Sequence, residues 1–519
     1  MNRTLGYTLV ACALAASAYT GSSWWLGQQI ETHYNDKMDT WAQEYAPDVE
    51  IVDRHYDRGV FSSRATLVLQ LPLPLPAQAP EDEEPCDDIC EELPDEDAQT
   101  SPMRPASLTL ARTDAPASHG PADRPAVRDE GEAGERKLRL HVVNDIRHGP
   151  WAGGQLALTV IDSRIVHVDG VHLSDKGRQA LGGIKSPTAH LVVGLDREAR
   201  GKVQLPAGEI IDPDNTANHL RWQVLDYDFT IPASQQRLIG TATWPSVSGS
   251  VELAKDDGHM RVRLALSNLR SRFDSELPDG QSLTVAGQYV DQAERLHVQF
   301  TKARGTPWVN LLDLKDIHSD TRITRPDTTQ DNGQPETMLN IEHRLDSQGM
   351  LGTVQMDKLA VHTELQKLDE AALMSLLETF NAQDPAEAPD TDSPAFQAPF
   401  RQLLAAQPQL RTRLNITVGK ETGSLDYALT LAEPGPTPET GTLMQAVKQK
   451  MSADLSLRLP IRWAELVEQA IDLPAGGIHE LARFGAAQGL LREDDGHWTT
   501  DTRLHDGKVI VNGRQIGSL

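Results

Sequence analysis

Apolar and polar residues alternate along most of the chain. In VFSSRATLVLQL, residues 60–71, one set of alternate positions holds Phe61, Ala65, Leu67, Leu69 and Leu71, and the other holds Ser62, Arg64, Thr66 and Gln70. An alternation with period two is typical of a strand that buries one face. Gly59 stands just before this strand, and we expect it to bend the chain there with a positive φ angle.

The same pattern recurs as strand, short polar turn and strand. Clear examples are LVVGLDREARGKVQL (191–205), VELAKDDGHMRVRLAL (251–266), LTVAGQYVDQAERLHVQF (283–300), LNIEHRLDSQGMLGTVQM (339–356) and LNITVGKETGSLDYALTL (414–431). Short turns join antiparallel neighbours, because parallel strands need a long crossover connection. The sequence therefore predicts a mainly β (α+β) fold with an extended antiparallel sheet, which we expect to be curved.

Helical spacing of apolar residues is confined to the C-terminal third. It predicts helices in residues 368–383, 395–407, 461–471 and 477–491, and we expect their apolar stripes to pack on the sheet. His505, Asp506 and Gly507 then form a strong hairpin signal between two alternating runs.

The N-terminus carries an uncharged run from Leu5 to Leu26, preceded by Arg3 and ending in Trp24 and Trp25. A helix of about 20 residues crosses the hydrocarbon of a bilayer, and Trp favours the membrane interface. This predicts a single-pass anchor in a bacterial inner membrane through residues 5–26, with an exported, periplasmic body. A cleaved signal peptide is the alternative, since residues 16–18, Ala-Ser-Ala, have the small-x-small form of a cleavage site.

An acidic, Pro-rich stretch interrupts the first strands. It holds Cys86 and Cys90, which could pair in an oxidising compartment, although its composition is typical of a disordered insertion. We divide the chain into a membrane-proximal segment (1–30), first strands of the body (31–76), the acidic insertion (77–135), an antiparallel β region (136–363) and an α+β C-terminal region (364–519).

Charge and composition exclude some function classes. The formal net charge is −26 and the pI is about 5.0, which argues against nucleic acid as a partner, because phosphate backbones bind clusters of Lys and Arg. A mean hydropathy of −0.43 is not that of a protein with many membrane spans.

Common catalytic and metal-binding signatures are missing from the sequence. It has no H-E-x-x-H pair, C-x-x-C pair, G-x-S-x-G elbow, Walker loop or dinucleotide fingerprint. We therefore predict no catalytic, cofactor-binding or metal-binding residues, no cofactor, and a protein that is not an enzyme.

Four short motifs, in this order, carry a family resemblance: WLGQQIE (25–31), YDRGVFSS (56–63), NDIRHGPW (144–151) and LHDGKVIVNG (504–513). Together they resemble the YdgA-like family of bacterial inner-membrane-anchored periplasmic proteins of unknown function. The resemblance implies a mainly β envelope protein without an established activity or cofactor. It marks positions that we expect to be structural: Arg58, Gly59, Phe61, Ser62, Ser63, His148, Gly149, Pro150, Asp506, Gly507, Asn512 and Gly513.

Two of these motifs give specific expectations. We expect Arg58 to pair with Asp57 or Asp53, and Trp151 to bury against the sheet after the Gly149-Pro150 turn.

Three hypotheses for function remain at this stage. The favoured one is a non-enzymatic binding or scaffold module of the cell envelope, with lipid or an envelope protein as partner and a lipid-binding groove on the sheet. The alternatives are an envelope hydrolase with an unrecognised site and a structural protein that self-associates into a homo-oligomer through sheet edges.

Overall fold

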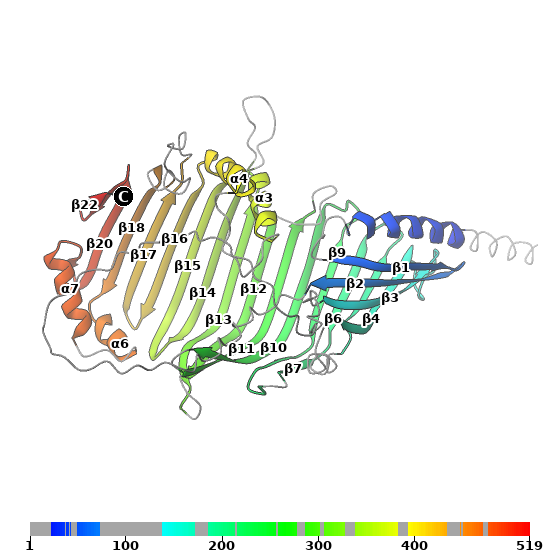
Figure 1. Ribbon diagram of the computed structural model, residues 1–519, viewed down its shortest axis with the longest axis horizontal. Coiled ribbons are helices and arrows are strands. Elements are labelled where there is room, and N and C mark those ends of the chain that lie inside the picture. The colour runs from blue at the N-terminus through cyan, green and yellow to red at the C-terminus, as the bar shows by residue number, and fades with distance from the viewer. Residues whose placement is uncertain are drawn as a thin grey trace, which may run out of the picture.

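One large antiparallel sheet forms the body of the protein in the computed structural model (Figure 1). The structure describes residues 22–36, 38–40, 42, 49–72, 137–171, 185–212, 215–255, 258–277, 286–301, 306–326, 338–381, 393–432, 447, 450–470 and 476–518. The strands are β1 (Glu50–Arg58), β2 (Ser62–Pro72), β3 (Lys137–His148), β4 (Thr159–Val171), β5 (Thr188–Val193), β6 (Ala199–Leu205), β7 (Gly208–Ile211), β8 (His219–Trp222), β9 (Leu225–Ile231), β10 (Arg237–Lys255), β11 (Gly258–Glu276), β12 (Gly287–Thr301), β13 (Val309–Thr324), β14 (Met338–Leu351), β15 (Val354–Asp369), β16 (Gln409–Val418), β17 (Glu421–Thr430), β18 (Ser452–Pro460), β19 (Arg492–Asp494), β20 (His497–His505), β21 (Lys508–Val511) and β22 (Arg514–Ser518). The predicted mainly β class is confirmed.

Nearly every strand pairs with the next strand in the sequence, which makes the sheet a long antiparallel meander. The exceptions are short hairpins: β7 and β8 add to one side of β10 while β6 pairs with β9, and β19 pairs with β20, which itself pairs with β18. Four of the five predicted strand-turn-strand units are confirmed as hairpins: β5–β6, β10–β11, β14–β15 and β16–β17. The prediction for residues 283–300 was wrong, because Gly287–Thr301 is one continuous strand, β12, whose polar stretch, residues 291–295, lies within the ladder and not in a turn. The curvature of the sheet remains a prediction.

Helices lie at the N-terminal end of the sheet and along its C-terminal half (Figure 1). Residues 22–36 and 38–40, called the N-terminal helix below, lie beside β1–β3 in Figure 1, while α3 (Glu370–Asn381), α4 (Pro394–Ala405), α6 (Trp463–Ala470) and α7 (Gly477–Ala487) belong to the C-terminal region. Of these, α3 and α4 lie over the strand ends near the middle of the sheet. Ser393 caps α4, where its side chain accepts the amide of Phe396. All four predicted C-terminal helices are confirmed, and α3, α4 and α6 contact the sheet at β15 and β18.

The two faces of the sheet differ sharply in chemistry. Residues directly opposite each other in antiparallel strands point to the same face. Successive pairs on one face connect Ser63, Ile146, Ile161, Leu191, Gly201, Phe229, Gly240, Phe273, Tyr289, Thr321, His343, Thr363, Thr412, Tyr427, Leu455, Thr502 and Val511. This row crosses the sheet from β2 to β21 without a carboxylate, Lys or Arg, and we call the surface on its side the apolar face.

The neighbouring row, on the other face, is dominated by charge. It connects Arg64, Asp145, Asp162, His190, Lys202, Asp228, Thr241, Arg272, Val290, Asp320, Arg344, His362, Arg413, Asp426, Ser456 and Asp501. Cross-strand ion pairs link many of these side chains, such as Arg64 with Asp145 at 2.8 Å and Arg413 with Asp426 at 3.3 Å. This polar face has the character of a surface in contact with water.

The described residues contain little closed core. Their buried apolar clusters are small: Ala152, Ala157 and Val160 form one, and Leu404 with Val447 forms another. The strands within this part of the chain contact their sheet neighbours, and no second sheet layer packs on them. Most side chains of the apolar face consequently remain partly exposed.

Some predictions lie outside the described residues. These are most of the anchor, residues 5–21, and the acidic insertion with Cys86 and Cys90. In the part of the chain that the structure describes, no helix is both long and apolar enough to span a membrane. The first strand begins only at Glu50, so the described residues from 31 to 40 are helical and the five-part division of the chain remains a prediction.

Candidate functional site

The N-terminal helix docks on the apolar face at β1–β3, and the sequence motifs meet at this junction. Ser23, Gly27, Glu31 and Tyr34 lie three or four residues apart, so they share one face of the helix. Glu31 accepts a hydrogen bond from Arg58 at 2.8 Å, and Tyr34 Oη accepts one from Asn144 Nδ2 at 3.2 Å. The WLGQQIE, YDRGVFSS and NDIRHGPW motifs, which are far apart in sequence, therefore form one contact.

His148 is the buried centre of the junction, with only 1 % of its surface exposed. Its Nδ1 lies 2.9 Å from the carbonyl oxygen of Ser23 on the helix, and its Nε2 lies 3.2 Å from Ser63 Oγ on β2. A carbonyl oxygen can only accept, so Nδ1 donates to it and the neutral ring accepts from the Ser63 hydroxyl through Nε2. Burial lowers the pKa of His148 from its ordinary value of 6.5, against the opposing effect of the Ser23 carbonyl, which keeps the ring neutral.

Gly27 allows the helix to approach the His148 ring. A Cβ atom on Gly27 would lie 2.6 Å from His148 Cε1 and 2.9 Å from Nε2. Such distances are shorter than van der Waals contact, so the glycine is required by packing. The sequence already held this signal in WLGQQIE, but its partner is more than a hundred residues away.

Arg58 makes a different ion pair from the one predicted. It pairs with Glu31 of the N-terminal helix, and its guanidinium carbon lies 5.8 Å from the centre of the Trp24 ring. The predicted pairing with Asp57 or Asp53 was wrong, because sequence neighbours on a strand point away from Arg58 or lie along the strand, whereas the helix crosses directly over it. Arg58 thus joins the helix to the sheet through charge and through an aromatic contact.

Two further expectations at these motifs need correction. The predicted bend at Gly59 is present in the tight β1–β2 turn, but it does not use a positive φ angle; glycine is needed there because a Cβ would lie 2.5 Å from the carbonyl oxygen of Ser62. Trp151 does not bury against the sheet but is 56 % exposed, because the β3–β4 connection carries it beyond the strand ends. Gly149 takes φ 122° and is buried beside Pro150, so the residue that bends this connection is the glycine.

Of the remaining motif positions near the junction, Phe61 and Ser62 are exposed and Ser63 is buried. Phe61 is 46 % exposed in the β1–β2 turn, where its carbonyl oxygen accepts the amide of His148 at 3.0 Å. Ser62 is exposed and pairs with Arg147 in the β2–β3 ladder. Ser63 is buried on the apolar face, next to His148.

The C-terminal motif forms two tight turns. Asp506 and Gly507 have φ angles of 48° and 70° between β20 and β21, and Asn512 and Gly513 have φ angles of 51° and 84° between β21 and β22. These left-handed pairs are the geometry of two-residue hairpin turns, and the predicted hairpin is confirmed. Asn512 is also buried: its Oδ1 accepts the amide of Asp501 at 3.0 Å, and its Nδ2 donates to the carbonyl of Gly489 at 3.0 Å.

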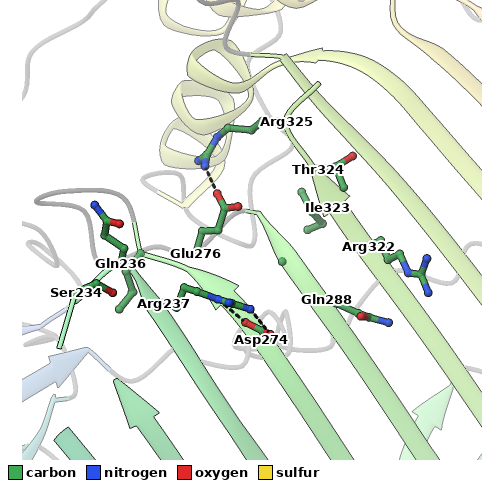
Figure 2. Close-up of a pocket in the computed structure, with 12 residues that line it drawn as sticks. Ser234, Gln236, Arg237, Asp274, Glu276, Gln288, Arg322, Ile323, Thr324 and Arg325 are labelled. Carbon is green, nitrogen blue, oxygen red and sulfur yellow. Dashed lines mark hydrogen bonds and ion pairs between the residues drawn. The ribbon is translucent and has the colours of Figure 1, made fainter. Parts of the chain in front are cut away.

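A polar groove of about 990 Å³ opens on the polar face at the ends of β10–β13 (Figure 2). Arg237 binds Asp274 through two hydrogen bonds of 3.1 and 2.5 Å. Arg325 donates to Glu276 at 2.9 Å and to both oxygens of Glu370 at 2.9 and 2.7 Å. Each of these guanidinium groups is already paired with carboxylates. We therefore interpret the groove as part of an ion-pair network that holds α3 against the strand ends, and not as an anion-binding site.

Other chemical sites are sparse in the described residues. In them, no three His, Cys, Asp or Glu side chains lie together in a way that could hold a metal ion. Ser63 and His148 have the spacing of a nucleophile and a base, but both are buried and the third group is a backbone carbonyl. Their arrangement suits a latch between helix and sheet.

These features define a class of protein: a single-sheet antiparallel β protein with one apolar face, on which a buried histidine docks an N-terminal helix. A family model described as a bacterial protein of unknown function, DUF945, matches residues 1–517, and the chain belongs to this family. No curated protein and no solved structure matches it.

Proposed function

We propose that the chain is a YdgA-like, non-enzymatic binding protein of the bacterial envelope, tethered to the inner membrane with its body in the periplasm, and that its apolar face binds the acyl chains of lipids. The observation that carries this proposal is the row of uncharged side chains that crosses 17 strands and on which no second sheet layer packs within the part of the chain that the structure describes. A soluble sheet has no reason to keep one face uncharged over that span unless something apolar covers it.

The dimensions of the apolar face suit acyl chains. Strands lie about 4.8 Å apart, so the row extends roughly 75 Å across the sheet. The row on one side of it is also mainly apolar, as in the run Ile323, Ile341, Leu365, Leu410 and Leu429. The row on the other side includes Asp291 and then continues as Leu345, Val361, Leu414, Leu425 and Leu457. Three alternate positions on a strand span about 14 Å, which is close to the roughly 15 Å that one leaflet's acyl chains occupy.

Lipid fits this face better than a folded protein partner. A protein interface mixes apolar anchors with charged and polar groups at its rim, whereas the central row contains no carboxylate, Lys or Arg, and its polar groups are the hydroxyls of Ser, Thr and Tyr and the imidazole of His343. Acyl chains need only apolar contact, which contributes about 25 cal/mol per Å² buried. An envelope protein is the other candidate partner, and the experiment below separates the two.

The tether is supported by the sequence and by the position of the N-terminal helix. The uncharged run of residues 5–21 leads directly into Ser22, where the described helix begins. Trp24 and Trp25 are 48 % and 56 % exposed on its first turns, as expected for residues at a membrane interface. An alkaline phosphatase domain fused after Leu519 will be active in cells if the body is periplasmic and inactive if it is cytoplasmic.

Photo-crosslinking tests lipid binding. The full chain is incubated with a phospholipid that carries a diazirine in the middle of one acyl chain, and labelled residues are located by mass spectrometry. We expect labels at alternate positions, such as Leu191 and Phe229, and not at their neighbours His190 and Asp228 on the polar face. Labels on both faces alike, or none beyond residue 40, would refute lipid binding and shift the proposal to a protein partner.

A matched pair of variants sharpens this test. Ala242 and Thr241 are adjacent on β10 but point to opposite faces, since Ala242 pairs with Tyr227 and Thr241 with Asp228. Ala242→Glu places a carboxylate on the apolar face and should reduce crosslinking on neighbouring strands several-fold. Thr241→Glu adds the same charge to the polar face and should leave crosslinking unchanged.

A hydrolase is a second candidate because Ser63 and His148 lie 3.2 Å apart. A fluorophosphonate probe will label Ser63 if it is an activated nucleophile. We expect no labelling, because the N-terminal helix covers both side chains. Self-association through the exposed outer strand β22 would instead appear as a homo-oligomer in analytical ultracentrifugation.

A further inference from the structure

The strand ends nearest the start of the N-terminal helix expose a set of large apolar side chains. β1, β3 and β5 end there and β2, β4 and β6 begin there. Together with the first turns of the helix, the three connections form what we call the aromatic end. Its exposed members, each 40–63 % accessible, are Trp24, Trp25, Val60, Phe61, Trp151, Leu156 and Leu195.

Hydrogen bonds hold these connections side by side. The helix start joins the β3–β4 connection through the 2.9 Å contact between Ser23 and His148. The β1–β2 turn joins the same strand end through the 3.0 Å bond from the His148 amide to the Phe61 carbonyl. The β3–β4 connection joins β5 through the 2.8 Å bond from the Leu158 amide to the Val193 carbonyl. The exposed side chains therefore gather at one end of the molecule and are not scattered.

We propose that the aromatic end rests in the headgroup region of the bilayer. This deepens the proposed function, because it rests on the membrane tether. The uncharged residues 5–21 run into the helix at this end, so a tether places these connections at the membrane surface. Three of the nine tryptophans of the chain lie here, and Trp is the side chain that most favours the interface.

The charges at this end do not oppose contact with lipid. Arg58 is paired with Glu31 at 2.8 Å, and Arg147 is paired with Asp162 at 2.9 Å. The β5–β6 connection also carries Asp196, Arg197 and Glu198, and Glu198 is paired with Arg200 at 2.5 Å, so charges of both signs balance at this end. An end with large apolar side chains and balanced charges can enter the headgroup region. The contact would hold the body in one orientation. It would also place one end of the apolar face at the membrane surface, where lipid can move onto that face.

Trp151 is the residue that tests this surface. Trp24 and Trp25 would approach lipid in any tethered protein, whereas Trp151 lies on a loop that only a docked body brings to the bilayer. The full chain is placed in nanodiscs of phosphatidylethanolamine and phosphatidylglycerol whose acyl chains carry bromine, which quenches Trp emission at short range. Wild type is compared with Trp151→Phe and with Trp308→Phe, a matched change in the connection before β13, away from the aromatic end.

Trp151→Phe should remove roughly a third of the quenched emission, if three interfacial tryptophans contribute alike. Trp308→Phe should leave the quenched part intact, and circular dichroism should be the same for all three proteins. If quenching is unchanged in Trp151→Phe while the chain is still in the discs, the proposed membrane contact of the aromatic end is refuted, whereas the membrane tether is not. If the aromatic end binds a second copy of the chain instead of lipid, quenching will also be unchanged, and ultracentrifugation will show a dimer that Trp151→Phe weakens. A chain that does not enter the discs overturns the tether and the surface together.

Discussion

Replacing Gly27 by alanine should loosen the N-terminal helix, although alanine is the better helix former. In an exposed helix this change contributes about 1 kcal/mol of stability. Here the new Cβ would lie 2.6 Å from His148 Cε1, and the ring cannot yield freely because Ser23 and Ser63 hold both of its nitrogens.

The magnitude follows from these contacts. Overpacking a filled site costs about 1–3 kcal/mol. Displacing the ring also weakens two hydrogen bonds, each of which contributes about 0.5–1.5 kcal/mol. After the gain in helix propensity, we expect a net loss of about 1–4 kcal/mol in docking. Since about 1.4 kcal/mol is a tenfold change in equilibrium, opening of the helix should increase at least several-fold.

Hydrogen exchange of the full chain, followed by mass spectrometry, measures this opening in residues 22–36. Gly477→Ala is the matched control, because it adds the same methyl to a helical glycine with no atom within 4 Å. The control should leave exchange in residues 22–36 unchanged. Adding His148→Ala to Gly27→Ala should relieve the clash, so the two changes should be non-additive. Equal or slower exchange in Gly27→Ala than in wild type would refute the reasoning.

Three further predictions concern pH, a turn and an ion pair. The pKa of His148 is lowered by burial, so the junction is fully stable above about pH 6.5 and weakens as the pH falls below that value. Protection of the amides in residues 22–36, after correction for the intrinsic pH dependence of exchange, should fall from pH 7.5 to 5.5, and His148→Gln should abolish that change. Asn512→Ala should lower the thermal unfolding temperature, because it removes two side-chain hydrogen bonds that together contribute about 1–3 kcal/mol to the free energy of unfolding, and because alanine is strained at the φ angle of 51°. Asn512→Gly should lower the unfolding temperature less, because glycine adopts that φ angle without strain. Asp313 is 5 % exposed, and its hydrogen bond from Arg295 at 2.6 Å lowers the pKa of its carboxyl below the ordinary 3.8. The pair therefore stabilises the fold above that pH, and this stabilisation is lost as the pH falls. Arg295→Leu should shift the midpoint of acid unfolding, followed by circular dichroism, to higher pH, and an unchanged midpoint would contradict the assignment.

The sheet could be predicted from the sequence for a physical reason. Each strand pairs mainly with its sequence neighbour, so a turn signal and a period-two pattern contain most of the information needed. Because one face is charged and the other is not, the alternation stays visible from VFSSRATLVLQL to the last hairpin. In a sheet buried on both faces this contrast would be absent.

The junction could not be predicted in the same way, because its contacts connect distant residues. Ser63 and His148 are 85 positions apart, and Arg58 and Glu31 are 27 apart on different elements. In the sequence, Ser23, Gly27 and Glu31 are four residues apart, as on one face of a helix, but nothing in it marks the strands on which that face packs. Trp151 was misjudged for a related reason: an aromatic residue after a Gly-Pro pair resembles a core residue, and only the strand ends show that it lies beyond the sheet.

The neighbour-to-neighbour order of the sheet also has a consequence for how the chain folds. Strands that pair with their immediate predecessor need only short loops to close, and the entropy of loop closure grows with loop length. Each hairpin can therefore add to the growing edge as soon as it is available, starting from β1 and ending at β22. In the proposed export of the body, the strands would emerge in order from β1 to β22 and could fold in the order in which they arrive, with a single growing edge to protect at each stage.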